Sequence, residues 1–312
     1  MANASQAARA AGNTGPAAHT PPPPPIAAPL AAEPDFMDSV LHLFEIAQGA
    51  LTSGGAVDEF GFDPEFTTHL LLPVLRPLYR SWFRVDVEGG ENIPESGAGL
   101  VVSNHAGAIA VDSVMTQVAA HDALPTSRYL RMLAADLVFK VPLLSEVASR
   151  AGHVRASVPT AEALLSRGEL VGVWPEGFKG IGKPFQKRYQ LQRFGRGGFV
   201  AVALRTGAPL IPTAIVGSEE IYPMIGDAKG LAKLFDLPYF PITPSFPWLG
   251  PLGLIPLPSK WTIRFGEPIE TLSYGSDAAD DPAVVFALAD QMRDRIQQML
   301  IEMLLHRTNV FQ

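Results

Sequence analysis

The amino-acid sequence predicts an α/β fold with a mainly parallel central sheet that is flanked by helices. Three observations carry this prediction: short apolar runs typical of buried strands, helical stretches between several of them, and the alternation of the two from about residue 84 onward. A length of 312 residues suits one large α/β domain with extensions, or about two domains.

Two segments precede the alternating pattern. Residues 1–34 contain 12 Ala and 8 Pro, and only Arg9 and Glu33 carry charge, so we expect a disordered arm that cannot bury enough apolar surface to fold. Residues 35–83 show two apolar patterns at helical spacing, the second across 66–82. We expect an N-terminal helical pair that packs on the core or lies in a membrane interface.

Residues 84–312 are expected to form the α/β domain. The expected strands span 83–87, 99–102, 129–133, 170–174, 209–216 and 261–265. The expected helices span 112–120, 160–167, 197–205 and 282–306. The last of them follows Asp280 and Asp281 and has Pro282 in its first turn, which is a strong signal for a helix start.

A proline-rich apolar excursion interrupts this domain at residues 237–259. Its 23 residues carry no charge and are long enough to span a bilayer, but seven of them are prolines, which exclude a spanning helix. The excursion either packs back on the domain or contacts lipid or an acyl chain.

The first chemical motif is the segment Ser103 to Asp112, which follows an expected strand and leads into a helix. A histidine at the carboxyl end of a parallel strand lies where α/β sheets place their sites. Asp112 is the only acidic residue between Glu95 and Asp122 and is therefore the natural partner for His105. If the residues between them are helical, the separation of seven puts both side chains on one face. Such a carboxylate fixes the tautomer of the imidazole.

Two further motifs follow later strands. Residues 173–180 bring together a carboxylate, a glycine turn and a cation in Glu176, Gly177 and Lys179, and such a turn with a neighbouring cation is suited to holding an anion. The strand from Pro209 has a second proline at Pro212, which predicts an edge strand or a bulge that shapes a pocket wall.

In their order and spacing, these motifs resemble those of the glycerolipid acyltransferase family. The family's Asn-His…Asp block resembles Asn104, His105 and Asp112, and its Phe-Pro-Glu-Gly-Thr-Arg block resembles residues 174–179. Its later Pro-Ile-Val-Pro block resembles residues 209–212, and residues 265–269 are similar to the family's final strand. The resemblance covers residues 84–270.

Two departures from the family pattern concern the acceptor. Six residues separate His105 from Asp112, instead of four, which resembles the branch of mono- and diacylglycerol acyltransferases. Phe178 and Lys179 replace the usual Thr-Arg, so a point charge stands where Arg forms a bidentate grip on phosphate.

The resemblance implies an O-acyltransferase that moves a fatty acyl group from an acyl thioester to a lipid hydroxyl. The thioester, of coenzyme A or of acyl carrier protein, is a co-substrate, and no cofactor or metal is implied. His105 would be the general base and Asp112 its orienting partner. The implied substrate-binding residues are Asn104, Glu176, Gly177, Lys179, Lys183, Arg193 and Pro212. Because the substrates are lipids, we expect peripheral membrane contact on the cytoplasmic side.

Charge is unevenly distributed along the chain. The formal net charge is −7, which argues against a nucleic-acid-binding protein. Residues 177–218 nevertheless carry seven cations and no acid, so the rest of the chain carries −14. Such a basic segment suits a phosphate-bearing donor, a phosphate-bearing acceptor or an anionic lipid surface, unless it is simply a solvated loop. The absence of cysteine excludes disulfides, a thiol nucleophile and Cys-ligated metals.

Three functions are compatible with these sequence features. The first is acyl transfer to a lysophospholipid such as 1-acylglycerol-3-phosphate. The second keeps this chemistry with a neutral mono- or diacylglycerol, or another alcohol, as acceptor. The third, of another class, is a lipid-binding module or a thioester hydrolase in which the His–Asp pair activates water.

Overall fold

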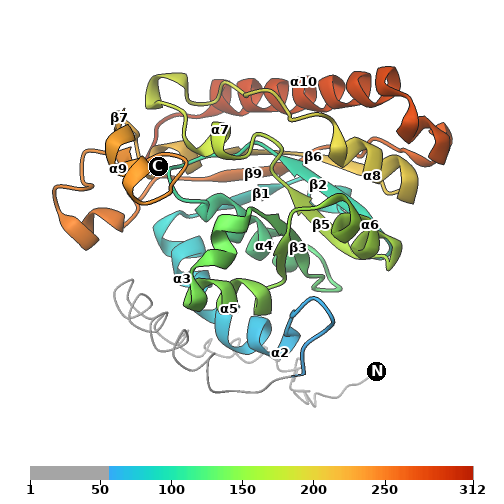
Figure 1. Cartoon of the computed structure of the whole chain (residues 1–312), viewed down its shortest axis with the longest axis horizontal. Coiled ribbons are helices and arrows are strands. Elements are labelled where there is room, and N and C mark those ends of the chain that lie inside the picture. Colours follow the sequence, from blue (N-terminus) through green and yellow to red (C-terminus); the bar gives the residue numbers. More distant parts are fainter. Residues whose placement is uncertain (1–55, 312) are drawn as a thin grey trace, which may run out of the picture. The chain divides into compact units, whose positions relative to one another are not determined.

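The computed structural model describes residues 56–311, and Figure 1 shows how their helices and strands are arranged. The arm expected over residues 1–34 and the first helix of the expected N-terminal pair lie outside the described residues.

The second helix of the expected pair runs without interruption from Pro64 to Trp82. It consists of α2 (Pro64–Phe66), η1 (Thr67–Leu71), α3 (Leu72–Pro77) and η2 (Leu78–Trp82), of which η1 and η2 are π-helical. Asp63 caps its start by accepting a hydrogen bond from the Phe66 amide at 2.9 Å. The wide π turns flank the prolines, which remove backbone donors within the helix. Phe66 and Leu72 are buried in the core, so this helix packs on the domain.

Seven strands form the central sheet, in the order β1-β9-β6-β2-β5-β3-β4. Their bounds are β1 (Asp86–Glu88), β2 (Gly99–Ser103), β3 (Leu130–Ala134), β4 (His153–Arg155), β5 (Leu170–Val173), β6 (Leu210–Val216) and β9 (Thr262–Phe265). Strands β2 to β6 are mutually parallel, whereas β9 is antiparallel to β6 and β1 is parallel to β9. The predicted α/β fold with a mainly parallel sheet is therefore confirmed.

The strand that contains Pro212 meets one of the two predicted alternatives, a bulge, but not the other, an edge strand. It is not an edge strand, because β6 lies inside the sheet between β2 and β9. The Pro212 carbonyl accepts a hydrogen bond from the Gly266 amide, so the proline nitrogen also faces the β9 side. There the register of pairing shifts by one residue between Leu210–Ile269 and Thr213–Phe265, so the segment that continues β9 contains a bulge. The missing N–H of Pro212 is accommodated at this bulge.

Helices cover both faces of the sheet (Figure 1). One face packs against the N-terminal helix and α4 (Val111–Ala123), and the other packs against α6 (Val158–Ser166), α8 (Gly198–Thr206) and α10 (Pro282–His306). The helix α10 has the predicted bounds, and its cap Asp281 accepts a hydrogen bond from the Ala283 amide at 2.8 Å. In the described part of the chain, no helix is both long and apolar enough to cross a membrane.

The segment between β6 and β9 leaves the body of the domain and carries the predicted excursion. It contains β7 (Gly226–Asp227), α9 (Lys229–Leu234), β8 (Pro241–Ile242) and η7 (Gly250–Leu254). Large apolar side chains are exposed along it, among them Leu234, Trp248 and Leu252. In Figure 1 this orange segment lies beside the sheet, away from the long helix α10.

Candidate active site

A His–Asp pair lies at the carboxyl end of β2. His105 Nδ1 is 2.8 Å from Asp112 Oδ2, and the Asp112 side chain is fully buried whereas that of His105 is 13% exposed. The same carboxylate accepts hydrogen bonds from the amides of Ala106 and Ser113, each at 2.9 Å. Asp112 lies in the first turn of α4, where the helix dipole favours a negative charge. This arrangement holds the Asp112 carboxylate against one nitrogen of the imidazole.

A loop rather than a helix brings the two residues together. The prediction that helical spacing would place them on one face is wrong, because α4 begins only at Val111. Gly107 turns the chain at φ = 80°, a left-handed conformation that favours glycine. The carboxylate in the first turn of α4 then reaches back to His105 and Ala106.

Asn104 anchors this loop to the sheet. Its Nδ2 donates to the Ile215 carbonyl at 3.0 Å, and its Oδ1 accepts from the Ile215 amide at 2.8 Å. The side chain is fully buried, and both of its polar atoms bond to the backbone of β6. Asn104 therefore fixes the position of the neighbouring His105. Its predicted contact with substrate stays a prediction.

Glu176 supports the backbone of His105 from a neighbouring strand end. Its Oε1 accepts a hydrogen bond from the His105 amide at 2.8 Å, and its Oε2 accepts one from the Gln192 amide at 2.6 Å. Gly177, at φ = 54° and ψ = −143°, turns the chain into the short helix α7 (Phe178–Ile181). Such a conformation is available essentially to glycine alone.

A buried charge network lies behind Glu176. Lys183 Nζ is 3.6 Å from Glu176 Oε2 and 3.0 Å from Glu219 Oε1, and all three side chains are almost fully buried. Burial raises the pKa of Glu219 to about 7, although Lys183 opposes this shift. Lys183 was expected to bind substrate, but its ammonium is enclosed by protein acids, so we correct its role to an internal counter-ion.

Trp174 and Tyr239 complete the surroundings of His105. The Trp174 ring lies edge-on to the imidazole, with 6.2 Å between the ring centroids. Tyr239, from the excursion, donates its hydroxyl to the Ala108 carbonyl at 2.7 Å. Burial raises the pKa of Tyr239, so it remains a protonated donor. The excursion therefore contacts the loop that carries His105.

Sequence reasoning missed Gln192, Glu219 and Tyr239. Each of them reaches the site from another segment of the chain, and no local sequence motif indicates its role. The one available signal was the acidic pair Glu219 and Glu220, which comes directly after the buried strand β6 at the edge of the sheet where His105 lies.

Comparison with known proteins decides the family. A family model described as Acyltransferase matches residues 84–216, which include both the His105 and Glu176 motifs. An uncharacterized protein of Mycobacterium tuberculosis is 59% identical over 261 residues, which cover 84% of this chain and 73% of that protein. The chain belongs to the glycerolipid acyltransferase family. The predicted enzyme class, an O-acyltransferase, is thereby confirmed.

One more distant relative of this acyltransferase and one solved structure of similar fold carry descriptive names. The "DGAT1/2-independent enzyme synthesizing storage lipids" of Gallus gallus is 28% identical over 190 residues, which cover 61% of this chain and 53% of that protein. The crystal structure of the 1-acyl-sn-glycerophosphate (LPA) acyltransferase PlsC from Thermotoga maritima matches with a TM-score of 0.53 at 17% identity. It covers 88% of this chain and 94% of that chain, and the likeness is one of fold.

The basic segment of the acyltransferase is less uniform than its sequence suggests. Lys183 is internal, and Arg205 forms ion pairs of 3.0 Å with Glu162 and Asp280. The exposed cations of the segment are Lys179, Lys187, Arg188, Arg193 and Arg196, for which the described structure shows no ion pair. The Gln192 amide donates a hydrogen bond to Glu176, and this contact places the segment that carries the exposed cations beside the site. Five of the seven cations of this segment are therefore available to bind an anion.

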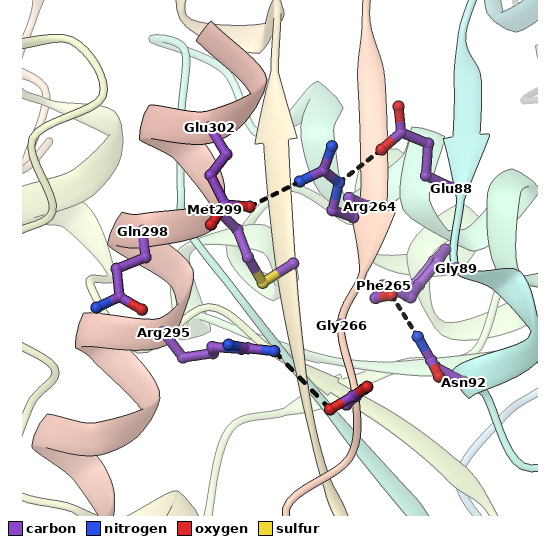
Figure 2. Close-up of a pocket in the computed structure, with 11 residues that line it drawn as sticks. Glu88, Gly89, Asn92, Arg264, Phe265, Gly266, Arg295, Gln298, Met299 and Glu302 are labelled. Carbon is purple, nitrogen blue, oxygen red and sulfur yellow. Dashed lines mark hydrogen bonds and ion pairs between the residues drawn. The ribbon is translucent and has the colours of Figure 1, made fainter. Parts of the chain in front are cut away.

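Two cavities border the sheet of the acyltransferase. One, of about 370 Å³, lies at the edge opposite His105, where Arg264 bridges Glu88 and Glu302 at 2.6 and 3.2 Å (Figure 2). Arg295 also approaches Glu267 there. The other, of about 420 Å³, lies at the carboxyl end of β3 and includes Phe178 of α7. Only the second is at the edge of the sheet where His105 lies.

Pro212 is the remaining predicted site residue. Its ring lies against Gly266, where an added Cβ would be 3.1 Å from Pro212 Cγ. Gly266 lines the cavity opposite His105, so the structure does not bring Pro212 to the His–Asp pair. No cluster of residues suited to holding a metal ion occurs within residues 56–311.

Proposed function

We propose that this acyltransferase moves a fatty acyl group from an acyl thioester to the hydroxyl of a glycerolipid, with His105 as general base. The observation that carries the proposal is the 2.8 Å contact between His105 Nδ1 and the buried Asp112 carboxylate. An ionised carboxylate accepts the Nδ1 proton, so the neutral imidazole presents an unprotonated Nε2. That nitrogen has no protein partner within the described residues and is free to take a proton.

The transfer then proceeds in one direct displacement. Nε2 of His105 takes the proton of the acceptor hydroxyl while the hydroxyl oxygen bonds to the thioester carbonyl carbon. The carbon–sulfur bond breaks, the sulfur leaves with the bonding electrons, and the imidazolium returns the proton to it. The products are an ester and a free thiol. Asp112 stabilises the imidazolium between the two proton transfers.

Direct transfer fits the residues near the pair. The chain has no cysteine, and the Ser113 hydroxyl next to Asp112 donates to the Ala110 carbonyl at 2.9 Å. A thioester is already an activated acyl donor, so a covalent acyl-enzyme offers no energetic advantage to this reaction. Glu176 contributes by fixing the His105 backbone at 2.8 Å rather than by chemistry.

The donor is an acyl thioester of coenzyme A or of acyl carrier protein. The five exposed cations from Lys179 to Arg196 lie on the segment that contacts Glu176 through Gln192. Both donors carry phosphate, and an acidic carrier protein adds further negative charge, so either is attracted to such a surface. Lys179 and Arg193 are the cations that we assign to this contact.

The acyltransferase meets its lipid substrates at a membrane surface, on the cytoplasmic side. The support is the exposed apolar surface of the segment between β6 and β9, where Leu234, Trp248 and Leu252 are 73%, 70% and 64% exposed. Exposed apolar surface of this kind gains free energy when it enters a lipid interface. Tyr239 links this surface to the loop of His105.

The test is an assay of purified protein with one long-chain acyl-CoA, with and without acceptor. We expect ester formation that requires a glycerolipid alcohol, either a lysophospholipid such as 1-acylglycerol-3-phosphate or a neutral mono- or diacylglycerol. Release of free fatty acid at the same rate without any acceptor would show a thioester hydrolase instead. Lipid binding without turnover would show a binding module.

A further inference from the structure

The cavity of about 420 Å³ beside α7 lies next to the proposed catalytic centre. It is bounded by the end of β3, by η4 (Asp136–Lys140), by Phe178 and by Asp236, the residue that precedes the excursion. Phe178 is two residues from Gly180, whose α-carbon approaches His105 so closely that an added Cβ would lie 2.9 Å from the His105 Cβ. One short helix therefore contacts His105 and lines the cavity.

The size and the walls of this cavity suit part of a glycerolipid. Its volume falls within the range of about 300 to 1,000 Å³ that is typical of small-molecule sites. Six of its nine lining residues are apolar, namely Ala134, Ala135, Leu137, Ala156, Phe178 and Pro238. Apolar walls with a few polar groups favour a ligand that combines hydrocarbon with hydroxyl groups.

The charged groups of the cavity are unfavourable for phosphate. Its lining contains the carboxylates of Asp136 and Asp236 and a single cation, Lys140. Lys140 is already paired with Asp236 at 3.1 Å, and the nearby Arg155 is paired with Asp136 at 3.2 Å. These two acids and two cations sum to zero charge, and both cations are already paired, so the cavity offers a phosphate group no unpaired cation, whereas uncharged hydroxyls can donate hydrogen bonds to its carboxylates.

None of the exposed cations of the basic segment lines this cavity. The positive surface begins beside the cavity, at Lys179 next to Phe178 on α7, but none of its cations belongs to the lining. The cations remain available to the phosphates of the donor, and the cavity remains without net positive charge.

We propose that this cavity receives the glyceryl group of an uncharged acceptor, a mono- or diacylglycerol, and that Asp136 and Asp236 select against phosphorylated acceptors. The proposal rests on the proposed acyl transfer and defines its acceptor. The two aspartates act through charge on the bound headgroup, so they determine specificity and leave the chemistry to His105.

The experiment compares two acceptors in the same mixed micelles with one long-chain acyl-CoA: a monoacylglycerol and the matching 1-acylglycerol-3-phosphate. For the wild type, we expect a kcat/KM that favours the monoacylglycerol by at least about tenfold. The double variant Asp136→Asn, Asp236→Asn frees Arg155 and Lys140 and should lower this preference by about tenfold, mainly through KM for the phosphorylated acceptor.

The matched control is Asp280→Asn. Asp280 is an equally exposed aspartate paired with Arg205 at 3.0 Å, at the opposite end of the sheet, so the preference should not change. All three aspartates are exposed, and circular dichroism will verify that the variants fold. A wild-type preference for the phosphorylated acceptor, or an unchanged preference in the double variant, overturns the inference while acyl transfer stands. Acylation of neither acceptor overturns the proposed function itself.

Discussion

At the scale of single residues, the site depends on close packing between α7 and the turn that carries His105. An ideal Cβ added at Gly180 would lie 2.8 Å from the Glu176 Cβ and 2.9 Å from the His105 carbonyl oxygen. Such separations are too short for real atoms, and the His105 side of the contact includes backbone. The absence of a side chain at this position therefore allows α7 to pack directly against Glu176 and His105.

The variant Gly180→Ala tests this packing. We expect it to displace His105 from its support and to lower kcat by about 100-fold, since a shift of about 1 Å in a reacting group has this effect. The measurement is steady-state acyl transfer, with circular dichroism to verify folding. Gly230→Ala is the control, because that glycine also lies in a short helix but has open space around it. Equal activity of both variants would contradict the importance of the contact.

The residue scale also shows how far the sequence predicts the site. His105 and Asp112 are close in the chain and follow a strand, so their pairing could be predicted from local pattern alone. The contacts of Lys183 with Glu219 and of Tyr239 with Ala108 join residues 36 and 131 positions apart. Such pairs depend on how strands are ordered in the sheet, which apolar patterns do not specify. For the same reason Lys183 was expected to bind substrate.

At the scale of elements, the strength of the local sequence signal decided whether a segment could be predicted. The helix α10 has 25 residues, a cap at Asp281 and a proline in its first turn, and its bounds were predicted correctly. The strand β4 has three residues and the helix α7 has four, which is too short for a period to be visible in the sequence. The interior position of β6 was missed because a bulge in its partner accommodates Pro212.

The excursion between β6 and β9 yields a prediction at this scale. The double variant Trp248→Ser, Leu252→Ser removes two side chains that are 70% and 64% exposed. Burial of such side chains in lipid contributes about 1.5 to 3 kcal/mol each, so binding to phospholipid vesicles should weaken by at least about tenfold. Sedimentation with vesicles measures this binding.

The control for this variant is Leu272→Ser. Leu272 is 75% exposed but packs beside Gly207 at the opposite edge of the sheet, so its replacement should leave vesicle binding unchanged. Equal binding of the double variant and the wild type would show that the excursion does not contact the membrane.

At the scale of the whole molecule, buried titratable groups make stability depend on pH. Burial lowers the pKa of His153 to about 4. Its Nε2 is 2.9 Å from Gln117 Oε1, while Gln117 Nε2 donates to the carbonyls of Leu130 and Ala151. Because the Gln117 amide nitrogen donates both of its hydrogens to carbonyls, its oxygen Oε1 faces His153. Nε2 of His153 therefore carries the proton of the neutral ring and donates it to this oxygen. A neutral His153 therefore stabilises the fold above pH 6.5, and this contribution is lost as the pH falls toward 4.

The variant His153→Gln isolates this effect, because glutamine stays neutral. The free energy of unfolding of the wild type relative to the variant should fall by about 2.5 kcal/mol between pH 7.5 and pH 4.5. Urea titrations at the two pH values give this difference, and contributions from other groups such as Glu219 cancel in it. Parallel pH dependence of the two proteins would mean that His153 takes up its proton equally in the folded and unfolded states.

The central claim is that His105 takes the proton of the acceptor hydroxyl. The most direct measurement is the rate of acyl transfer by His105→Gln, compared with His121→Gln. His121 lies on α4 and is 3.1 Å from Asp122, so the control changes a similar His–Asp pair away from the site. We predict that kcat falls by about 100-fold to 10,000-fold in His105→Gln and stays within about twofold of wild type in His121→Gln. A folded His105→Gln protein that transfers acyl groups at the wild-type rate would contradict the account.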